Sequence, residues 1–286
     1  MRSAESEPTS TIALLATLRD ARFAYGLRCP HCGACHVLRW GGFNDRQRYR
    51  CKACLRTFSD LTGTPAAYSK KLSLWPPFSD CLEGGLSIRR TAALLGIQPS
   101  TAFRWRHLLL GFLRQRDDDK IGGTIELGWV WFPYSEKGRR DLTRPPRERG
   151  VRYRSRYRGG SVNVVIACDA AGQVVTAVSG AVIGSLHLEE ALAGRIHGQP
   201  IVSARPGPYS PCAVFARRIG ASYQPVARVD KVKHYVLRLK RWLEPFRGVA
   251  TKYLPNYLVW HRRIDLVARK CFATAVLRWP MGDAYG

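Results

Sequence analysis

The chain has 286 residues, enough for two domains or for one large domain with appendages. It carries 46 Lys and Arg against 21 Asp and Glu, a formal net charge of +25 at pH 7. No apolar run reaches the roughly 20 residues of a membrane span, and the acid-containing N-terminus does not fit a secretory signal. We therefore expect no membrane partner, and the charge favours a polyanionic partner, most often nucleic acid.

The composition changes along the chain and predicts four parts. Residues 1–23 are expected to form a polar tail and a short helix. Residues 24–75 are rich in Cys and Gly, and residues 76–120 have a helical pattern that ends in an acidic linker. Residues 121–286 alternate strand-like and helical runs. A basic insert at 137–158, with ten Lys or Arg against two acids, interrupts this last part.

Four of the nine cysteines lie at the spacing of a tetrahedral zinc site. Cys29 and Cys32 form one CxxC pair, and Cys51 and Cys54 form a second pair after eighteen intervening residues. Gly33 lets the chain turn where a Cβ would crowd. Thiolates fill all four ligand places, so the pattern predicts a zinc ribbon with a closed, structural zinc ion. This use of cysteine fits a reducing compartment better than a disulfide framework.

The surroundings of the cysteines leave one alternative open and suggest a surface. Cys35 or His36 could replace one of the four ligands, although both lie very close to the first pair. The ribbon also carries basic residues that we expect to contribute to DNA contact: Arg39, Arg46, Arg48, Arg50, Lys52 and Arg56.

Residues 87–107 have the rhythm of a helix-turn-helix. Ser87 can cap the first helix, and Ala92 is small where the two helices would cross. Gly96 ends the first helix at a position that suits a positive φ. Ile97 and Phe103 are expected to point into the core, and the start of the second helix would enter a major groove. A plain helical hairpin is the alternative.

The predicted DNA contacts come from three places in the chain. They are Arg89, Arg90, Gln98, Ser100, Thr101, Arg104 and Arg106 of the helical part, Arg139 and Arg140 of the basic insert, and Lys240 of a late basic helix.

The order of elements after residue 121 predicts the fold of the last part. Three strands form a meander, and helices then alternate with strands, over 124–132, 161–169, 173–183, 186–194, 200–204, 211–219, near 226 and over 231–246. This order is typical of the RNase H-like plan. The whole chain is thus predicted to be a multidomain α+β protein with a zinc ribbon, a helix-turn-helix and an RNase H-like mixed α/β core. Five aromatic residues are expected to pack in it: Trp129, Trp131, Phe132, Trp242 and Trp260.

The same residues carry a resemblance that covers nearly the whole chain. The chain resembles DDE-type insertion-sequence transposases of the zinc-ribbon group. The similar pieces are CPHCG, YRCKACLRTFSDLTGT, Ser69–Leu72, the helix-turn-helix, Ser135–Arg139, Leu239–Trp242 and Gly248–Asp265.

The resemblance implies a chemistry and a set of ligands. In such enzymes three acidic or amide-bearing residues hold two Mg²⁺ ions, which activate the nucleophile and stabilise the leaving oxygen of a phosphoryl transfer. The first Asp lies in the middle of the first strand, the second ends the fourth strand, and the third ligand lies at or just before the following basic helix.

This sequence departs from that pattern at two of the three places. Gly128 stands where the first Asp is expected, and Ala204 stands where the second is expected. Asp230 is the candidate for the third place, with the role of a helix N-terminal acid that complements the helix dipole as the alternative. Glu126 shares the face of Gly128 but lies two residues away, and a divergent subfamily could use it. Asp169, in an Asp-Ala-Ala-Gly sequence, is expected to be a hairpin-turn residue, with a ligand role as the alternative.

These departures leave three hypotheses. We expect a transposase by descent that is catalytically impaired but binds DNA, with Glu126 and Asp230 as the remaining candidate acids. An active transposase and a DNA-binding regulator derived from a transposase are the alternatives. The expected cofactors are structural Zn²⁺, and Mg²⁺ only if the core is active. The expected partners are duplex DNA at insertion-sequence terminal repeats and a second copy of the chain, in the cytoplasm at the nucleoid.

Overall fold

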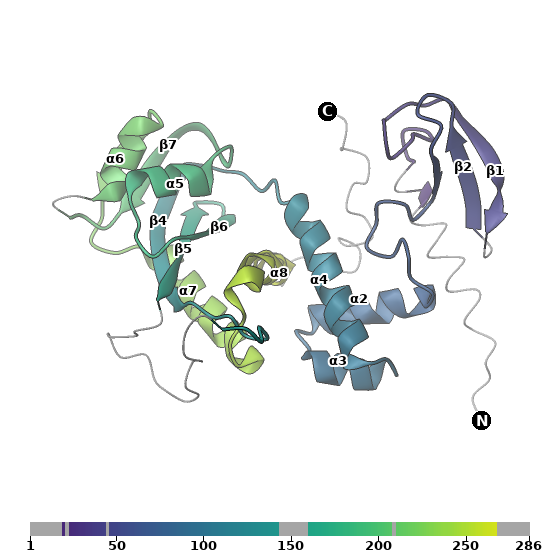
Figure 1. The fold of residues 1–286 in the computed structure, drawn as a ribbon. Helices are drawn as coiled ribbons and strands as arrows, with labels where there is room; N and C mark the ends of the chain where they lie inside the picture. The colour runs from purple at the N-terminus through teal and green to yellow at the C-terminus, as the bar shows by residue number, and fades with distance from the viewer. Residues whose placement is uncertain (1–18, 21–22, 44–45, 143–159, 208–209, 268–286) are drawn as a thin grey trace. The chain divides into compact units, whose positions relative to one another are not determined.

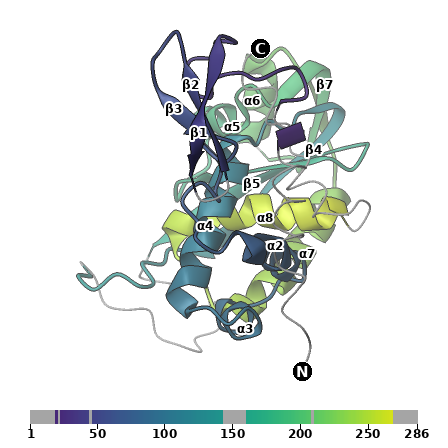
Figure 2. The same cartoon turned by 90° about the vertical axis from the view of Figure 1, so that its right-hand side faces the viewer.

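The computed structural model describes residues 19–20, 23–43, 46–142, 160–207 and 210–267 (Figures 1 and 2). The chain divides into two compact units, and the boundary lies at Leu113 inside helix α4. The predicted N-terminal tail lies almost entirely outside the described residues, as does most of the basic insert. None of the helices in the described ranges is long and apolar enough to cross a membrane.

The first unit begins with a small antiparallel sheet in the order β1-β2-β3, and its strands are Val37–Phe43, Arg46–Cys51 and Thr57–Ser59. Tyr49 and Phe58 stack with ring centroids 5.3 Å apart and form a small core with the buried Cys29 and Cys51. So small a core buries little apolar surface, and a domain of this size is expected to need a further source of stability such as a bound metal.

Helices follow the ribbon in the same unit: η1 (Leu72–Leu74), α2 (Trp75–Glu83), α3 (Ile88–Leu94) and α4 (Pro99–Gln115). Three aromatic rings hold α2 against α4. Trp105 stacks on Trp75 with centroids 4.9 Å apart and meets the edge of Phe78 at 5.4 Å. The buried face of α4 repeats at helical spacing through Ala102, Trp105 and Leu109.

The second unit contains a five-stranded mixed sheet. Strands β4, β5 and β6 form the predicted antiparallel meander, and β7 and β8 lie parallel on the other side of β4, in the order β6-β5-β4-β7-β8. Because this is the RNase H-like plan, the predicted fold class is confirmed. The strands are Ile121–Pro133, Ser161–Asp169, Val174–Ser179, Ile196–Ala204 and Ser222–Pro225.

Helices cover both faces of this sheet (Figure 1). Because side chains alternate along β4, Ile125 and Leu127 pack in one core with α5 and α6, while Val130 packs in another core with α7. The helical elements of this unit are α5 (Ser185–Leu192), α6 (Pro211–Arg218), α7 (Asp230–Leu243), η2 (Glu244–Phe246), η3 (Thr251–Tyr253) and α8 (Leu254–Val267).

Two of the five aromatic expectations are wrong. Trp129 and Trp131 are 41% and 45% exposed, because they lie on the part of β4 that extends beyond its pairing with β7. Phe132 is half-buried against the core on the α7 side. Trp242 and Trp260 do pack, with ring centroids 4.8 Å apart.

The acidic run predicted as a linker is an anchor. Asp117 accepts hydrogen bonds from Arg195 at 3.0 Å and from the fully buried Arg262, which also donates to Asp119 at 3.3 Å. Burial alone would raise the pKa of Asp117, but the two arginines outweigh burial and hold that pKa below its usual value. Separating such a buried pair would leave an uncompensated charge, which is strongly unfavourable. The ion pairs with Arg262 therefore hold the acidic run against α8.

Helix α8 packs on α7 through a buried histidine. The His261 Nδ1 atom lies 3.0 Å from the Tyr235 hydroxyl, and both side chains are nearly inaccessible to solvent. Burial lowers the pKa of His261 to about 4, with Asp265 raising it and Arg238 lowering it. The imidazole is therefore neutral in the folded protein at neutral pH.

His261 should make stability depend on pH below neutrality. Between pH 6.5 and 4 the unfolded chain binds a proton that the folded chain does not, so stability should fall as the pH falls through this window. The loss should approach roughly 3 kcal/mol. Urea unfolding of the second unit at several pH values measures it, and His261→Gln should flatten the profile. His234→Gln, on the exposed side of α7, is the control and should leave the profile unchanged.

Candidate functional site

The four predicted zinc ligands meet at one point of the ribbon. Their sulfur atoms all lie within 4.8 Å of one another, with 3.6 Å between Cys29 and Cys54 and between Cys32 and Cys51. Zn–S bonds of about 2.3 Å in a tetrahedron separate the sulfurs by about 3.8 Å, so this donor set fits zinc. The two alternative ligands, Cys35 and His36, are both outside the cluster.

The knuckle geometry explains why these ligands converge. The Cys29 amide donates to the Ala34 carbonyl, and Gly33 adopts a φ of +76°, which closes the first turn. The His31 amide also donates to the Cys29 sulfur at 3.4 Å. Around the second pair, backbone N–H groups of Cys54 and Ala53 are among the causes that lower the pKa of Cys51 to about 7, which favours its thiolate.

Replacing one ligand should remove the zinc and unfold the ribbon. Cys51→Ser should lose the single zinc ion expected per chain, because three thiolates do not close a structural site. Elemental analysis and circular dichroism measure the two effects. The matched control is Cys35→Ser, an exposed cysteine outside the cluster, which should keep its zinc. A folded, zinc-loaded Cys51→Ser protein would contradict this assignment.

The helical part has the predicted local features of a helix-turn-helix. The Ser87 hydroxyl caps α3 by accepting from the Arg90 amide at 3.3 Å, and Gly96 follows the helix with a φ of +60°. Ala92 is buried, as expected for a small residue at a helix crossing.

Two residues of this part differ from the prediction. Phe103 is 39% exposed, because the buried face of α4 runs through its neighbours Ala102 and Trp105. Arg106, a predicted DNA contact, is 1% exposed and donates to the Leu86 carbonyl. This bond holds α4 against the turn between α2 and α3. Arg106 is thus a structural residue and not a surface one.

The other predicted DNA contacts lie on the surface. Thr101 is half-buried, and Arg139 forms an ion pair with Glu136 at 3.0 Å. The exposed residues are Arg89, Arg90, Gln98, Ser100, Arg104, Arg139, Arg140 and Lys240.

In the core, Glu126 caps helix α7. Its Oε2 atom accepts from the backbone amides of Lys231 at 2.8 Å and Val232 at 3.4 Å. A carboxylate satisfies otherwise unpaired amides there and complements the positive end of the helix dipole. The prediction from sequence considered Glu126 only as a metal ligand and missed this role, which needs the approach of a helix 105 residues away in the chain.

Gly128 faces Val232 of helix α7. A Cβ built at this residue would lie 3.0 Å from the Cγ1 atom of Val232 and 3.9 Å from its Cβ. Val232 is 4% exposed and belongs to the core between the sheet and α7. A larger residue at position 128, aspartate included, therefore requires α7 or Val232 to move.

The other two expected ligand places also lack a converging set of acids. Ala204, the last residue of β7, is 1% exposed and packs with Leu127 in the apolar core on the α5–α6 side. Asp230 is the first residue of α7. Asp169 is the predicted turn residue, because its Oδ1 accepts from the Gln173 amide at 2.9 Å.

The chemistry of this donor set does not fit a two-metal centre. Among the described residues, the four zinc-ribbon cysteines are the only group of three or more His, Cys, Asp or Glu side chains whose ligand atoms converge. Glu126 and Asp230 thus have no third acid beside them, whereas two Mg²⁺ ions require several carboxylate ligands.

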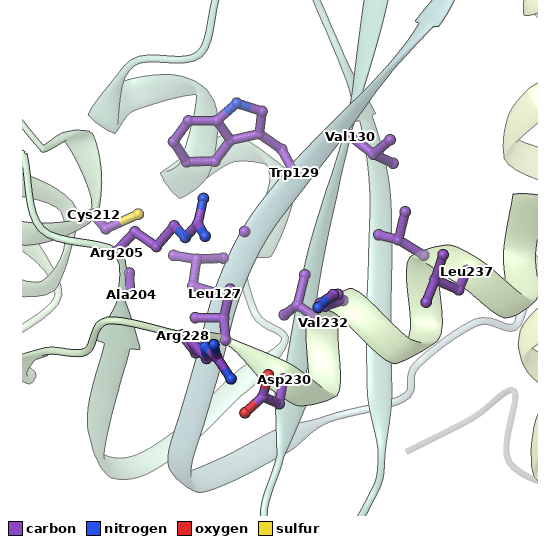
Figure 3. A pocket seen from close by; sticks show the side chains of 14 residues that line it. Leu127, Trp129, Val130, Ala204, Arg205, Cys212, Arg228, Asp230, Val232 and Leu237 are labelled. Atoms are coloured by element: carbon purple, nitrogen blue, oxygen red, sulfur yellow. The ribbon is translucent and has the colours of Figure 1, made fainter.

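A pocket lies at this place, with a volume of about 690 Å³. It opens beside β4 beyond the end of β7, and Figure 3 shows Arg205 and Arg228 extending into it on the two sides of Leu127. Three cations and one carboxylate line it, together with apolar groups: Arg205, Arg228, Lys233, Asp230, Leu127, Gly128, Trp129, Val130, Ala204, Cys212, Val229, Val232, Val236 and Leu237.

The zinc-ribbon cysteines lie in a part of the chain that matches a known family. Residues 12–57 match the family described as the transposase zinc-ribbon domain. An uncharacterized protein in transposable element ISH50 of Halobacterium salinarum is 27% identical over 257 residues, covering 84% of this chain and 86% of that protein. The predicted resemblance to insertion-sequence transposases is thereby confirmed.

The chain also has a low structural similarity to an integrase and a transposase. The HTLV-2 integrase catalytic core domain in complex with magnesium is 10% identical, with a TM-score of 0.31 over 49% of this chain and 84% of that chain. The Mos1 mariner paired end complex with Mn is 10% identical, with a TM-score of 0.28 over 70% of this chain and 75% of that chain.

The contact between Gly128 and Val232 can be tested by a double-mutant cycle. Gly128→Ala should lower the free energy of unfolding by about 1–3 kcal/mol, because a methyl group must enter a filled space. In a Val232→Ala background the same change should cost much less, giving a coupling energy above 0.5 kcal/mol. The control is Gly111→Ala in α4, where no atom lies within 4 Å of an added Cβ. Equal costs in both backgrounds would refute the close approach.

Proposed function

We propose that this chain is a transposase-derived protein that binds zinc and duplex DNA but does not carry out two-metal phosphoryl transfer. One observation carries the proposal: Glu126, two residues before Gly128 on β4, caps helix α7, and no third acid joins it and Asp230 among the described residues. The positions of Gly128 and Ala204 support it, because both are packed against apolar neighbours.

Charge near the expected metal position supports the same proposal. The pocket beside Gly128 is lined by Arg205, Arg228 and Lys233 against the single carboxylate of Asp230. Two divalent cations placed beside three positive side chains would be repelled, and the repulsion grows as the local dielectric falls. The residues present thus favour an anion over Mg²⁺.

DNA binding is proposed to rest on the first unit. Arg89, Arg90, Gln98, Ser100 and Arg104 are exposed around the two helices of the helix-turn-helix. With the net charge of +25, a polyanion is the natural partner. We take the partner to be the terminal repeats of an insertion sequence, because the ISH50 relative lies in a transposable element. Assembly with a second copy and a place at the nucleoid are part of the same proposal.

The regulator hypothesis makes the same use of the first unit. The two hypotheses differ only in the effect of binding. A regulator that binds terminal DNA without cutting it would block the sites at which an active transposase acts. The loss of acids at the core favours this hypothesis over an active enzyme.

The proposal is tested by incubating the zinc-loaded protein with terminal DNA of its element and Mg²⁺ or Mn²⁺. Duplex binding without strand cleavage is expected, with an affinity that falls steeply with salt because bound cations displace counterions. Arg104→Ala should weaken duplex binding at least fivefold, whereas Arg114→Ala at the other end of the same helix should change it less than twofold. Strand cleavage by the protein that is lost in the Glu126→Gln variant would contradict the proposal.

A further inference from the structure

One wall of the pocket is a part of β4 that pairs with a neighbouring strand on one side only. β4 pairs with β7 only as far as Glu126, opposite Ser203, whereas it continues to Pro133 in its pairing with β5 on the other side. Beyond Glu126, β4 therefore has no strand neighbour on the β7 side among the described residues. Leu127, Gly128, Trp129 and Val130 line the pocket along this edge. An exposed strand edge offers backbone amides to a ligand lying along it.

The cations of the pocket differ from the structural arginines of the same unit. Arg195, Arg218, Arg238 and Arg262 each form an ion pair with a carboxylate. Arg205, Arg228 and Lys233 are exposed and have no carboxylate partner within 4.0 Å in the described parts of the chain. Asp230 is the only acid in the lining, so the pocket carries a formal charge of +2.

The arrangement of these groups suits a polymer better than a small ion. Arg205 follows β7 and Arg228 precedes α7, and Figure 3 shows their side chains entering from different elements. Two separated guanidinium groups can each bind one phosphate of a strand in a bidentate manner. Above them Trp129, 41% exposed, offers an aromatic face on which a base can stack.

We propose that this pocket binds a single strand of nucleic acid directly through Arg205, Arg228 and Lys233, without a divalent metal. The inference rests on the proposed loss of the metal centre. The arginines hold phosphodiester groups along the open edge of β4, and Trp129 stacks on a base. The step is binding only, and no bond is formed or broken. In this proposal the core still binds a DNA strand, although it lacks the metal ligands that strand cleavage requires.

The test measures binding of a fluorescent dT12 oligonucleotide by anisotropy, with zinc-loaded full-length protein in buffer freed of other divalent metals. The protein carries Gln98→Ala and Arg104→Ala, so that the helix-turn-helix contributes little. Binding should be equal with and without 5 mM Mg²⁺. Adding Arg205→Ala and Arg228→Ala should weaken it at least tenfold and reduce the slope of log K against log salt by roughly 1.4, since each single-strand phosphate contact contributes about 0.7.

Two further variants separate the pocket from general charge. Lys233→Glu reverses one charge without touching either arginine and should also weaken binding. Arg217→Ala removes an exposed arginine of α6 that does not line the pocket, so it should change the affinity less than twofold. Trp129→Leu should weaken binding of dT12 but not alter the salt slope, because stacking releases no counterions.

Several outcomes would overturn the inference. Unchanged dT12 affinity in the double arginine variant, or binding that requires Mg²⁺, contradicts it. Full competition by micromolar dTMP or inorganic phosphate would identify a small-anion site instead of a strand site. Cleavage of terminal DNA in the assay of the preceding subsection would defeat the proposed function. Loss of dependence on Arg205 and Arg228 without cleavage would defeat this inference alone.

Discussion

The close approach of helix α7 to strand β4 is the contact on which the core depends. Glu126 binds the first free amides of the helix, and two residues further along Gly128 leaves space for Val232. The cap by Glu126 determines where α7 begins, and the absence of a side chain at Gly128 lets α7 lie close to β4. Two residues of one strand thus position the helix. The first contact gives Glu126 a structural role, and the second fills the space that an aspartate at position 128 would need.

The charges around the pocket follow from this packing. A two-metal centre tolerates crowded carboxylates because the ions neutralise them, and it would be destabilised by arginines at the same place. Here Arg205 and Arg228 lie at the ends of the segments that flank β4, with Asp230 as their single counter-charge. The charges of the lining residues thus suit an anion better than a pair of divalent cations.

Much of this could be predicted from the sequence, for identifiable reasons. The zinc site follows from spacing alone, and the strand order follows from local patterns that the sheet preserves, including the shared face of Glu126 and Gly128. The roles of residues that depend on contacts with distant parts of the chain could not be predicted from the sequence. Examples are the cap made by Glu126, the buried pairing of Asp117 with Arg262 on a helix that the pattern did not predict, and the exposure of Trp129 beyond the end of β7. The burial of Arg106 could not be predicted either, because it depends on which face of α4 packs inward.

Central to the proposed function is that the core holds no pair of divalent metal ions, because its acids do not converge. Soaking crystals of the zinc-loaded protein in millimolar Mn²⁺ and recording anomalous diffraction tests it directly. The prediction is anomalous density among Cys29, Cys32, Cys51 and Cys54, where zinc is expected, and none between Gly128, Ala204 and Asp230. Two manganese peaks about 4 Å apart beside Glu126 and Asp230 would contradict the account.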